Sequence, residues 1–315
     1  MSIANPYLHS ADPKSLHHMR LKKWATVASL TVATLLIIFK FFAYMRTDSV
    51  SMLSSLMDSA FDWVASLATM ISVAHAASPA DEDHRFGHGK VEALTALGQA
   101  IFIFGSSLYL FFESVHRFLQ PVRIQDAKSG LIVMLLSMFL TSFLILFQRY
   151  VIKKTSSIAI SADHLHYKGD LFMNIGVFSA LAWTYYSPWP YFDPLVSTVI
   201  AACLLYGAKE ITQESFDVLM DRELPEEKRL EIIEIAKKHP DVHSVHNLRT
   251  RTTGTRDFIE FHIELDRNMS LYQSHEVTEE LEKKLYEHFP KAEVIIHQEP
   301  EGHHHHKIDD EIKTK

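Results

Sequence analysis

Two pairs of ionisable residues stand inside apolar stretches of the sequence, where charged side chains are rare. Asp58 and Asp62 lie within one such stretch, and His166 and Asp170 lie at the head of another. Each pair has i, i+4 spacing, so on a helix its two side chains point the same way. Charged groups inside a bilayer usually face the bundle interior and mark an ion path. Three carboxylates and an imidazole on two helices therefore predict a four-ligand site for a divalent metal.

A single intramembrane aspartate has a structural alternative, because it can simply hydrogen-bond a neighbouring helix. Two pairs of metal-ligand type with matching spacing favour a metal site instead. Such ligands bind metal only when deprotonated, so metal entry expels protons. His166 is the expected titrating group, because imidazoles ordinarily titrate near neutral pH. The site therefore predicts metal/proton antiport by alternating access.

The elements that must position these residues are membrane-spanning helices. A span needs about 20 mainly apolar residues. Lys40, near the end of the first candidate span, is expected to snorkel to the interface. Lys and Arg are more frequent before the first span and after the second and fourth than on the other side, which predicts cytoplasmic termini. We expect six spans, at residues 24–45, 50–77, 91–118, 127–150, 161–186 and 194–213.

The remaining composition limits the function classes. The formal net charge of −7 does not favour nucleic-acid binding. The single cysteine, Cys203, excludes an intrachain disulfide and a thiolate metal cluster within one chain. Residues 1–23 contain no apolar signal region and are expected to form a cytoplasmic tail.

After the last span the sequence becomes charged, and residues 214–300 predict a separate cytoplasmic α+β domain. Amphipathic helices are expected at 225–239 and 271–289, each ending before a proline. Residues 257–266 alternate as in a strand, and further strands are expected at 242–252 and 292–297, giving the order αββαβ. Residues 301–315, with four consecutive histidines, are expected to be a disordered tail.

Two further groups carry metal-ligand side chains. In the polar loop 79–90, Asp81, His84 and His88 have i, i+3 and i+4 spacings, although such a loop is equally explained by solvation. The α+β domain holds recurrent histidines that are each typical of a surface, but that together allow a metal site. They are His243, His246, His262, His275 and His297, with Glu299 close behind.

In combination, these motifs resemble the cation diffusion facilitator family, in its bacterial zinc and ferrous-iron efflux branch, over roughly residues 24–300. The matching stretches are Ser-Leu-Met-Asp58-Ser-Ala-Phe-Asp62, Asp81-Glu-Asp-His84-Arg-Phe-Gly-His88-Gly-Lys-Val-Glu, His166-Tyr-Lys-Gly-Asp170, Leu-Met-Asp221-Arg-Glu-Leu and Val-Ile-Ile-His297-Gln-Glu-Pro.

The resemblance implies six transmembrane helices plus a cytoplasmic metallochaperone-like domain, working as a homodimer in the bacterial inner membrane. By position it implies a transport site at Asp58, Asp62, His166 and Asp170, and a loop site at Asp81, His84 and His88. It also implies a two-metal site at a cytoplasmic dimer interface, formed by His246, His262, His275, His297 and Glu299.

Two residues depart from the pattern of this branch. Glu299 stands where the branch usually has Asp, which puts the geometry of the two-metal site in question. His164 is an extra imidazole two residues before His166 and a competing ligand.

The expected function is export of Zn²⁺, with Fe²⁺ or Cd²⁺ as further substrates and protons as the counter-ion. Oxygen and imidazole ligands without sulfur also suit Mn²⁺ and Co²⁺, so an exporter of those metals is one alternative. A membrane metal sensor is another. An intramembrane metalloprotease is disfavoured, because the sequence contains no His-Glu-x-x-His motif.

Overall fold

The computed structural model describes residues 13–47, 50–120, 131–186, 189 and 191–302. Its contacts divide the chain into two compact units, Met1–Phe216 and Asp217–Lys315. Residues 1–12 of the predicted N-terminal tail and residues 303–315 of the predicted C-terminal tail lie outside the described residues.

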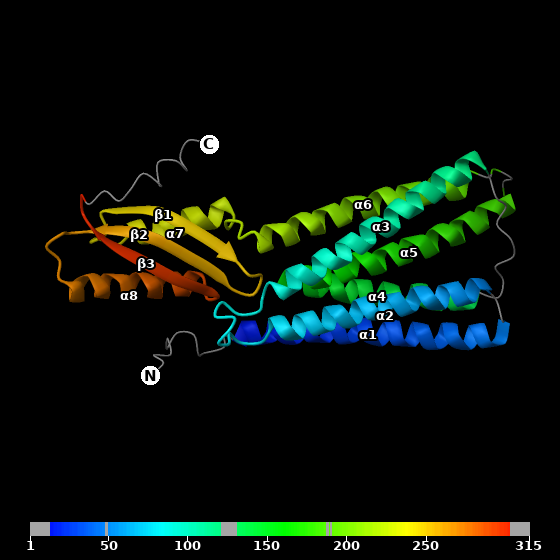
Figure 1. Cartoon of the computed structure of the whole chain (residues 1–315), viewed down its shortest axis with the longest axis horizontal. Coiled ribbons are helices and arrows are strands. Elements are labelled where there is room, and N and C mark those ends of the chain that lie inside the picture. The colour runs from blue at the N-terminus through cyan, green and yellow to red at the C-terminus, as the bar shows by residue number, and fades with distance from the viewer. Residues whose placement is uncertain (1–12, 48–49, 121–130, 187–188, 190, 303–315) are drawn as a thin grey trace. The chain divides into compact units, whose positions relative to one another are not determined.

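The first unit is built from long helices that lie where the apolar stretches predict them (Figure 1). Helix α1 packs against α2 and α4, α5 packs against α3 and α4, and α2 packs against α3. Even the shortest, with 25 residues, is about 37 Å long at the rise of an α-helix. In the described residues these helices are α1 Pro13–Thr47, α2 Val50–Ala76, α3 Val91–Leu119, α4 Leu131–Thr155, α5 Ile158–Tyr186 and α6 Phe192–Leu219.

Four of these helices are both long enough and apolar enough to cross a membrane. Helices α2 and α5 are long enough but are not among these four, and they carry the ionisable pairs that predict the metal site. Apolar length therefore accounts for four of the six predicted spans. Within the described residues those four are Leu16–Arg46, Val91–Leu119, Met134–Thr155 and Phe192–Leu219.

Several helix boundaries differ from the sequence-based expectation, and those of α1 and α4 have a clear local cause. Helix α1 begins at Pro13 rather than at Trp24, because the polar residues that follow Pro13 continue the helix beyond its apolar part. Proline suits a first helical position, where its missing N–H costs no hydrogen bond. Helix α4 continues to Thr155 and ends where Ser156 adopts a left-handed φ of 50°. That turn separates α4 from α5.

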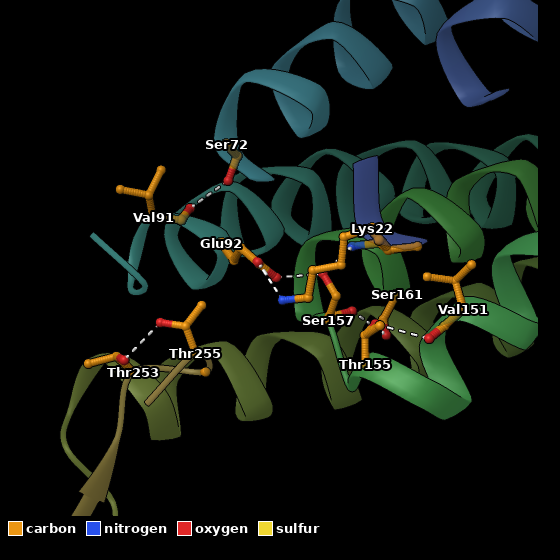
Figure 2. A network of polar contacts seen from close by, with 12 residues as sticks. Lys22, Ser72, Val91, Glu92, Val151, Thr155, Ser157, Ser161, Thr253 and Thr255 are labelled. Carbon is orange, nitrogen blue, oxygen red and sulfur yellow. Dashed lines mark hydrogen bonds and ion pairs between the residues drawn. The ribbon is translucent and has the colours of Figure 1, made fainter. Parts of the chain in front are cut away.

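A buried polar network joins α1, the start of α3 and the residue before α5 (Figure 2). Lys22 of α1 donates from Nζ to Glu92 Oε1 of α3 at 2.7 Å, and Ser157, just before α5, donates from Oγ to Glu92 Oε2 at 2.5 Å. Both Glu92 oxygens thus have partners, which offsets the cost of burying the ion pair. The network fixes where α1, α3 and α5 meet.

The second unit has the predicted order of helix, strand, strand, helix and strand. Strand β2 is the middle strand of the sheet, antiparallel to β1 and parallel to β3, so the sheet is mixed. The elements are α7 Glu226–Lys237, β1 Ser244–Thr252, β2 Asp257–Leu265, α8 Leu271–His288 and β3 Ala292–Pro300.

The core of this unit lies on one face of β2. Phe261 and Ile263 are fully buried there, as the alternation of the strand predicts, and they belong to one cluster with Leu281 and Leu285 of α8 and Ile232 of α7. Both helices therefore cover the apolar face. The opposite face of the sheet is left to polar side chains, including the histidines.

Candidate metal centres

Three of the four ionisable residues that form the predicted pairs of α2 and α5 meet in the helical unit. His166 Nε2 lies 2.7 Å from Asp62 Oδ1 and 3.8 Å from Asp170 Oδ2. One ligand atom from each of the three residues lies within 4.8 Å of the others. Zinc bonds of about 2 Å place neighbouring ligand atoms about 3.3 Å apart, between the 2.7 and 3.8 Å found here, so small side-chain shifts would fit one ion. The three residues form the membrane group.

Two predicted participants lie outside the membrane group. Asp58 is exposed and stands one helical turn from Asp62, about 6 Å along the axis of α2. His164 is half-buried and does not belong to the membrane group either. Its Nδ1 is buried and has no hydrogen-bond partner among the described residues. The i, i+4 spacing therefore aligns Asp58 with Asp62 without bringing both carboxylates to His166.

Lys40 of α1 is a charged neighbour whose role the sequence does not reveal. Its Nζ donates to Ser59 Oγ at 2.7 Å and to the backbone oxygen of Ser55 at 3.1 Å, both on α2. Its charge also interacts with Asp62 and Asp170. The side chain is thus directed towards α2. The prediction that it snorkels to the membrane interface is therefore wrong for this structure. An ammonium group at this position offsets part of the negative charge of the membrane group.

A second buried network lies one turn away and involves Asp163 of α5. Its carboxylate accepts hydrogen bonds from Ser29 at 2.5 Å, Gln148 at 2.8 Å and Ser66 at 3.3 Å. Ser66 also lies 2.8 Å from the hydroxyl of Tyr167. These residues come from α1, α2, α4 and α5, so the network fixes how α2 and α5 face each other and thereby positions the membrane group.

The loop after α2 brings together all three of its predicted ligands, which we call the loop group. Asp81 Oδ1 accepts the backbone N–H of His84 at 2.6 Å, and Asp81 Oδ2 lies 3.2 Å from His88 Nε2. Gly87 turns the chain with a φ of 79°. The N–H of His84 and the nearby imidazoles lower the pKa of the Asp81 carboxyl. That carboxyl is therefore ionised at neutral pH, as a metal ligand must be.

The polar face of the sheet holds a third arrangement, the sheet group. His246 of β1 pairs directly with His262 of β2, and Glu264 pairs with Glu299 of β3. His262 Nδ1 lies 2.7 Å from Glu299 Oε1, and His246 Nε2 lies 3.3 Å from Glu299 Oε2. The side chain of Glu299 is only 2% exposed. A bulge follows His246, where Asn247 has a φ of 51°.

The other two residues predicted for this domain site behave differently. His297 lies beside the sheet group, since its Nε2 is 3.7 Å from Glu299 Oε1 and its ring centroid is 4.6 Å from that of His262. His275 stands on α8, is exposed and lies 3.4 Å from Glu279. It is not part of the sheet group, because helix α8 covers the apolar face of the sheet.

All three groups offer oxygen and imidazole nitrogen only. The free Cys203 lies in none of them. Such donors suit Zn²⁺, Fe²⁺, Mn²⁺ and Co²⁺, and they disfavour metals that require thiolate.

The sequence matches two family descriptions that together cover most of its length. Residues 26–220 match "Cation efflux transmembrane domain", and residues 224–301 match "Cation efflux protein, cytoplasmic domain". Both matches agree with the resemblance drawn from the motifs.

Individual relatives agree with the family matches. The chain is 41% identical over 281 residues to the cation-efflux pump FieF of Citrobacter koseri, covering 89% of this chain and 93% of the relative. It is 40% identical over 289 residues to the FieF pump of Yersinia enterocolitica, covering 92% and 95%. Among solved structures, the metal-bound C-terminal domain of the CzcD transporter from Thermotoga maritima is 32% identical, covering 26% of this chain and 100% of that one with a TM-score of 0.25.

The relatives are named as efflux pumps, so the chain is a transporter rather than an enzyme. It contains a transmembrane cation-efflux part and a smaller part with a mixed sheet. The protein belongs to the cation efflux family of membrane metal transporters, which is the cation diffusion facilitator family that its motifs resemble.

Proposed function

We propose that this protein exports Zn²⁺ from the cytoplasm in exchange for protons, with Fe²⁺ and Cd²⁺ as further substrates. The observation that carries the proposal is the meeting of Asp62, His166 and Asp170 inside a helical bundle. A site that only needed to sense metal would have no reason to lie between two long helices of the transmembrane domain.

The proposed substrate follows from the donor set. Two carboxylates and one imidazole leave room for a fourth ligand, and four-coordination favours zinc. Asp58 is the proposed fourth ligand, reached when α2 and α5 move relative to each other during transport. Ferrous iron and cadmium remain compatible with the same donors. Export of Mn²⁺ or Co²⁺ is the second candidate, since both accept oxygen and imidazole ligands.

Proton coupling follows from competition for the same atoms. A proton on Asp62, His166 or Asp170 removes a lone pair that the metal needs. Metal binding from the cytoplasmic side therefore releases protons, and protons arriving from the other side release the metal. Two-sided competition of this kind needs only one site and two alternating orientations.

The proposed topology has all six helices crossing the bacterial inner membrane, with both termini in the cytoplasm. Helices α2 and α5 cross despite their polar residues, because Asp62, His166 and Asp170 meet between helices rather than facing lipid. The loop group and the second unit then lie in the cytoplasm.

The sheet group, with His297 beside it, is proposed to bind regulatory zinc at a homodimer interface. His275 would then ligate only in the dimer, because α8 keeps it away from the sheet group within one chain. Zinc bound there would stabilise the dimer by mass action and couple transport to cytosolic metal.

Purified protein in sealed liposomes tests the proposal. A Zn²⁺ gradient is imposed while one dye reports metal and another reports lumenal pH. We expect zinc entry with opposite proton movement in the wild type and neither in Asp62→Asn. Zinc binding without flux would instead support a membrane sensor, and flux of Mn²⁺ or Co²⁺ in place of Zn²⁺ would support the second candidate.

A further inference from the structure

His75, in the last turn of α2, lies against the loop group. Its ring centroid is 4.6 Å from that of His88, with the planes inclined by 62°. The ring centroid of His84, which belongs to the loop group, lies at nearly the same distance from that of His88, 4.7 Å. His88 is thus flanked by two imidazoles, of which only His84 has been counted as a ligand.

These ring distances are close to those of imidazoles that share one zinc ion. A Zn–N bond of about 2 Å puts each ring centroid about 3 Å from the metal, so two rings at a tetrahedral angle have centroids about 5 Å apart. As the side chains lie here, the nitrogens of His75 are outside the 4.8 Å spacing that joins the other three residues. Rotation of this exposed side chain is the movement required.

The loop group has room for such a ligand. Asp81, His84 and His88 supply three donors, and a structural zinc site usually has four. His88 is nine-tenths buried, and its Nδ1 has no hydrogen-bond partner among the described residues. A buried ring nitrogen without a partner is costly. Binding of a metal ion in the loop group would let the His88 ring reorient and give this nitrogen a partner.

The backbone around His75 is already held in place. The carbonyl of His75 accepts the N–H of Ser78 at 2.9 Å. One turn earlier, Ser72 Oγ donates to the backbone oxygen of Val91 at 3.0 Å and ties the end of α2 to the start of α3 (Figure 2). The backbone that carries His75 is therefore anchored, so the movement proposed for His75 is a rotation of its side chain.

We infer that His75 is the fourth ligand of the loop group, which makes it a closed site of three imidazoles and one carboxylate for zinc or a similar divalent ion. This inference rests on zinc binding by Asp81, His84 and His88, which the family resemblance implies and which their meeting in one group supports. A closed four-ligand site retains its ion, whereas three protein ligands leave a position for water or exchange. Zinc bound here would hold the end of α2 to the following loop and would not be a stop on the transport path.

The alternative is that His75 only packs its ring against His88. The variant His75→Phe separates the two roles, because phenylalanine keeps the ring contact and has no ligand nitrogen. His75→Gln removes both, and His116→Gln, an exposed histidine near the other end of α3, is the control. All are made in the full-length protein whose other two groups are disabled by Asp62→Asn, His166→Gln, His262→Gln and Glu299→Gln.

Zinc affinity is measured by competition with a chromogenic chelator, and coordination by the visible absorption of bound Co²⁺, which is strong only when tetrahedral. We expect both His75 variants to bind zinc at least about 10-fold more weakly and to lose the tetrahedral spectrum. Even the loss of a residue that only hydrogen-bonds a metal ligand weakens binding by about that factor. His116→Gln should change neither.

A further variant, His88→Ala in the same background, distinguishes zinc binding by the loop group from the role of His75 as its fourth ligand. If it still binds one zinc as tightly, the loop group is not a zinc site and the proposed role of the loop fails. If it loses zinc while His75→Phe and His75→Gln bind as the parent does, the loop site stands and the role of His75 is overturned.

Discussion

The membrane group and the sheet group are built around the same contact on different scaffolds. In each, a histidine nitrogen lies 2.7 Å from a carboxylate oxygen, between His166 and Asp62 in one and between His262 and Glu299 in the other. The sheet group takes its spacing from neighbouring strands in register, which are fixed by backbone hydrogen bonds. The membrane group takes its spacing from the packing of α2 on α5, which side chains alone maintain.

The difference separates a site that can change its geometry from one that cannot. Helices can shift by an ångström or two as rigid bodies, whereas a strand register moves only in whole steps. A transporter must release its ion, so a site between helices suits transport. A fixed site between strands suits an ion that stays. The following variants test this comparison, from the largest expected effect to the smallest.

The largest effect is expected from Asp62→Asn. The variant removes an anionic ligand from the membrane group at nearly constant shape. Loss of a residue that only hydrogen-bonds a metal ligand costs up to about 100-fold, so loss of a ligand itself should reduce zinc flux in liposomes by more than about 100-fold. Zinc binding by the sheet group should be unchanged in equilibrium dialysis, because the two groups share no residue. Equal loss at both groups would contradict their independence.

Glu299→Gln should act in the opposite way. Glu299 is the one carboxylate of the sheet group and touches both of its histidines, so we expect zinc affinity there to fall about 10- to 100-fold. Flux through the membrane group should persist, although its dependence on cytosolic zinc should weaken. Glu260→Gln, an exposed change on β2, is the control. Abolished flux in Glu299→Gln would show that the sheet group lies on the transport path.

Asp163→Asn tests whether side-chain packing alone sets the membrane group. An amide cannot accept all three hydrogen bonds that the carboxylate accepts, and leaving a buried donor without a partner costs about 1–3 kcal/mol. We expect a lower thermal denaturation temperature in detergent and reduced flux, with zinc affinity of the sheet group unchanged. Wild-type flux together with wild-type stability would contradict the role of Asp163 in positioning the membrane group.

The smallest effect is expected from Glu299→Asp. The shorter carboxylate keeps the charge but has less reach towards the two histidines, which lie 2.7 and 3.3 Å from the present oxygens. Zinc affinity of the sheet group should therefore fall less than in Glu299→Gln, by about one order of magnitude or less. Equal losses in the two variants would mean that the reach of the carboxylate matters as much as its charge.

The sequence predicts what depends on local pattern. The strand alternation places Phe261 and Ile263 in the core, and the short spacings within the loop bring Asp81, His84 and His88 together. Both features are fixed by a few consecutive residues, because strand faces and short turns have few geometric solutions.

Long-range features are missed for a physical reason. Lys40 and Asp163 meet their partners only through the packing of α1, α2 and α4, and a hydropathy pattern does not fix how helices rotate about their axes. The bulge at Asn247 carries no distinctive sequence signal. Spacing alone also overestimates convergence, since it places Asp58 with Asp62 and gives no sign that α8 directs His275 away from the sheet.

The most direct test of proton-coupled transport at the membrane group uses a pH gradient without a metal gradient. Liposomes containing the purified protein are prepared with equal Zn²⁺ on both sides, and an acidic interior is then imposed. Protons should leave the lumen down their gradient and zinc should enter in exchange, so that zinc accumulates inside against its own gradient. This accumulation should stop when the pH gradient is collapsed, and Asp62→Asn should show none of it. A zinc distribution that stays equal in the wild type while the pH gradient persists would contradict antiport at this site.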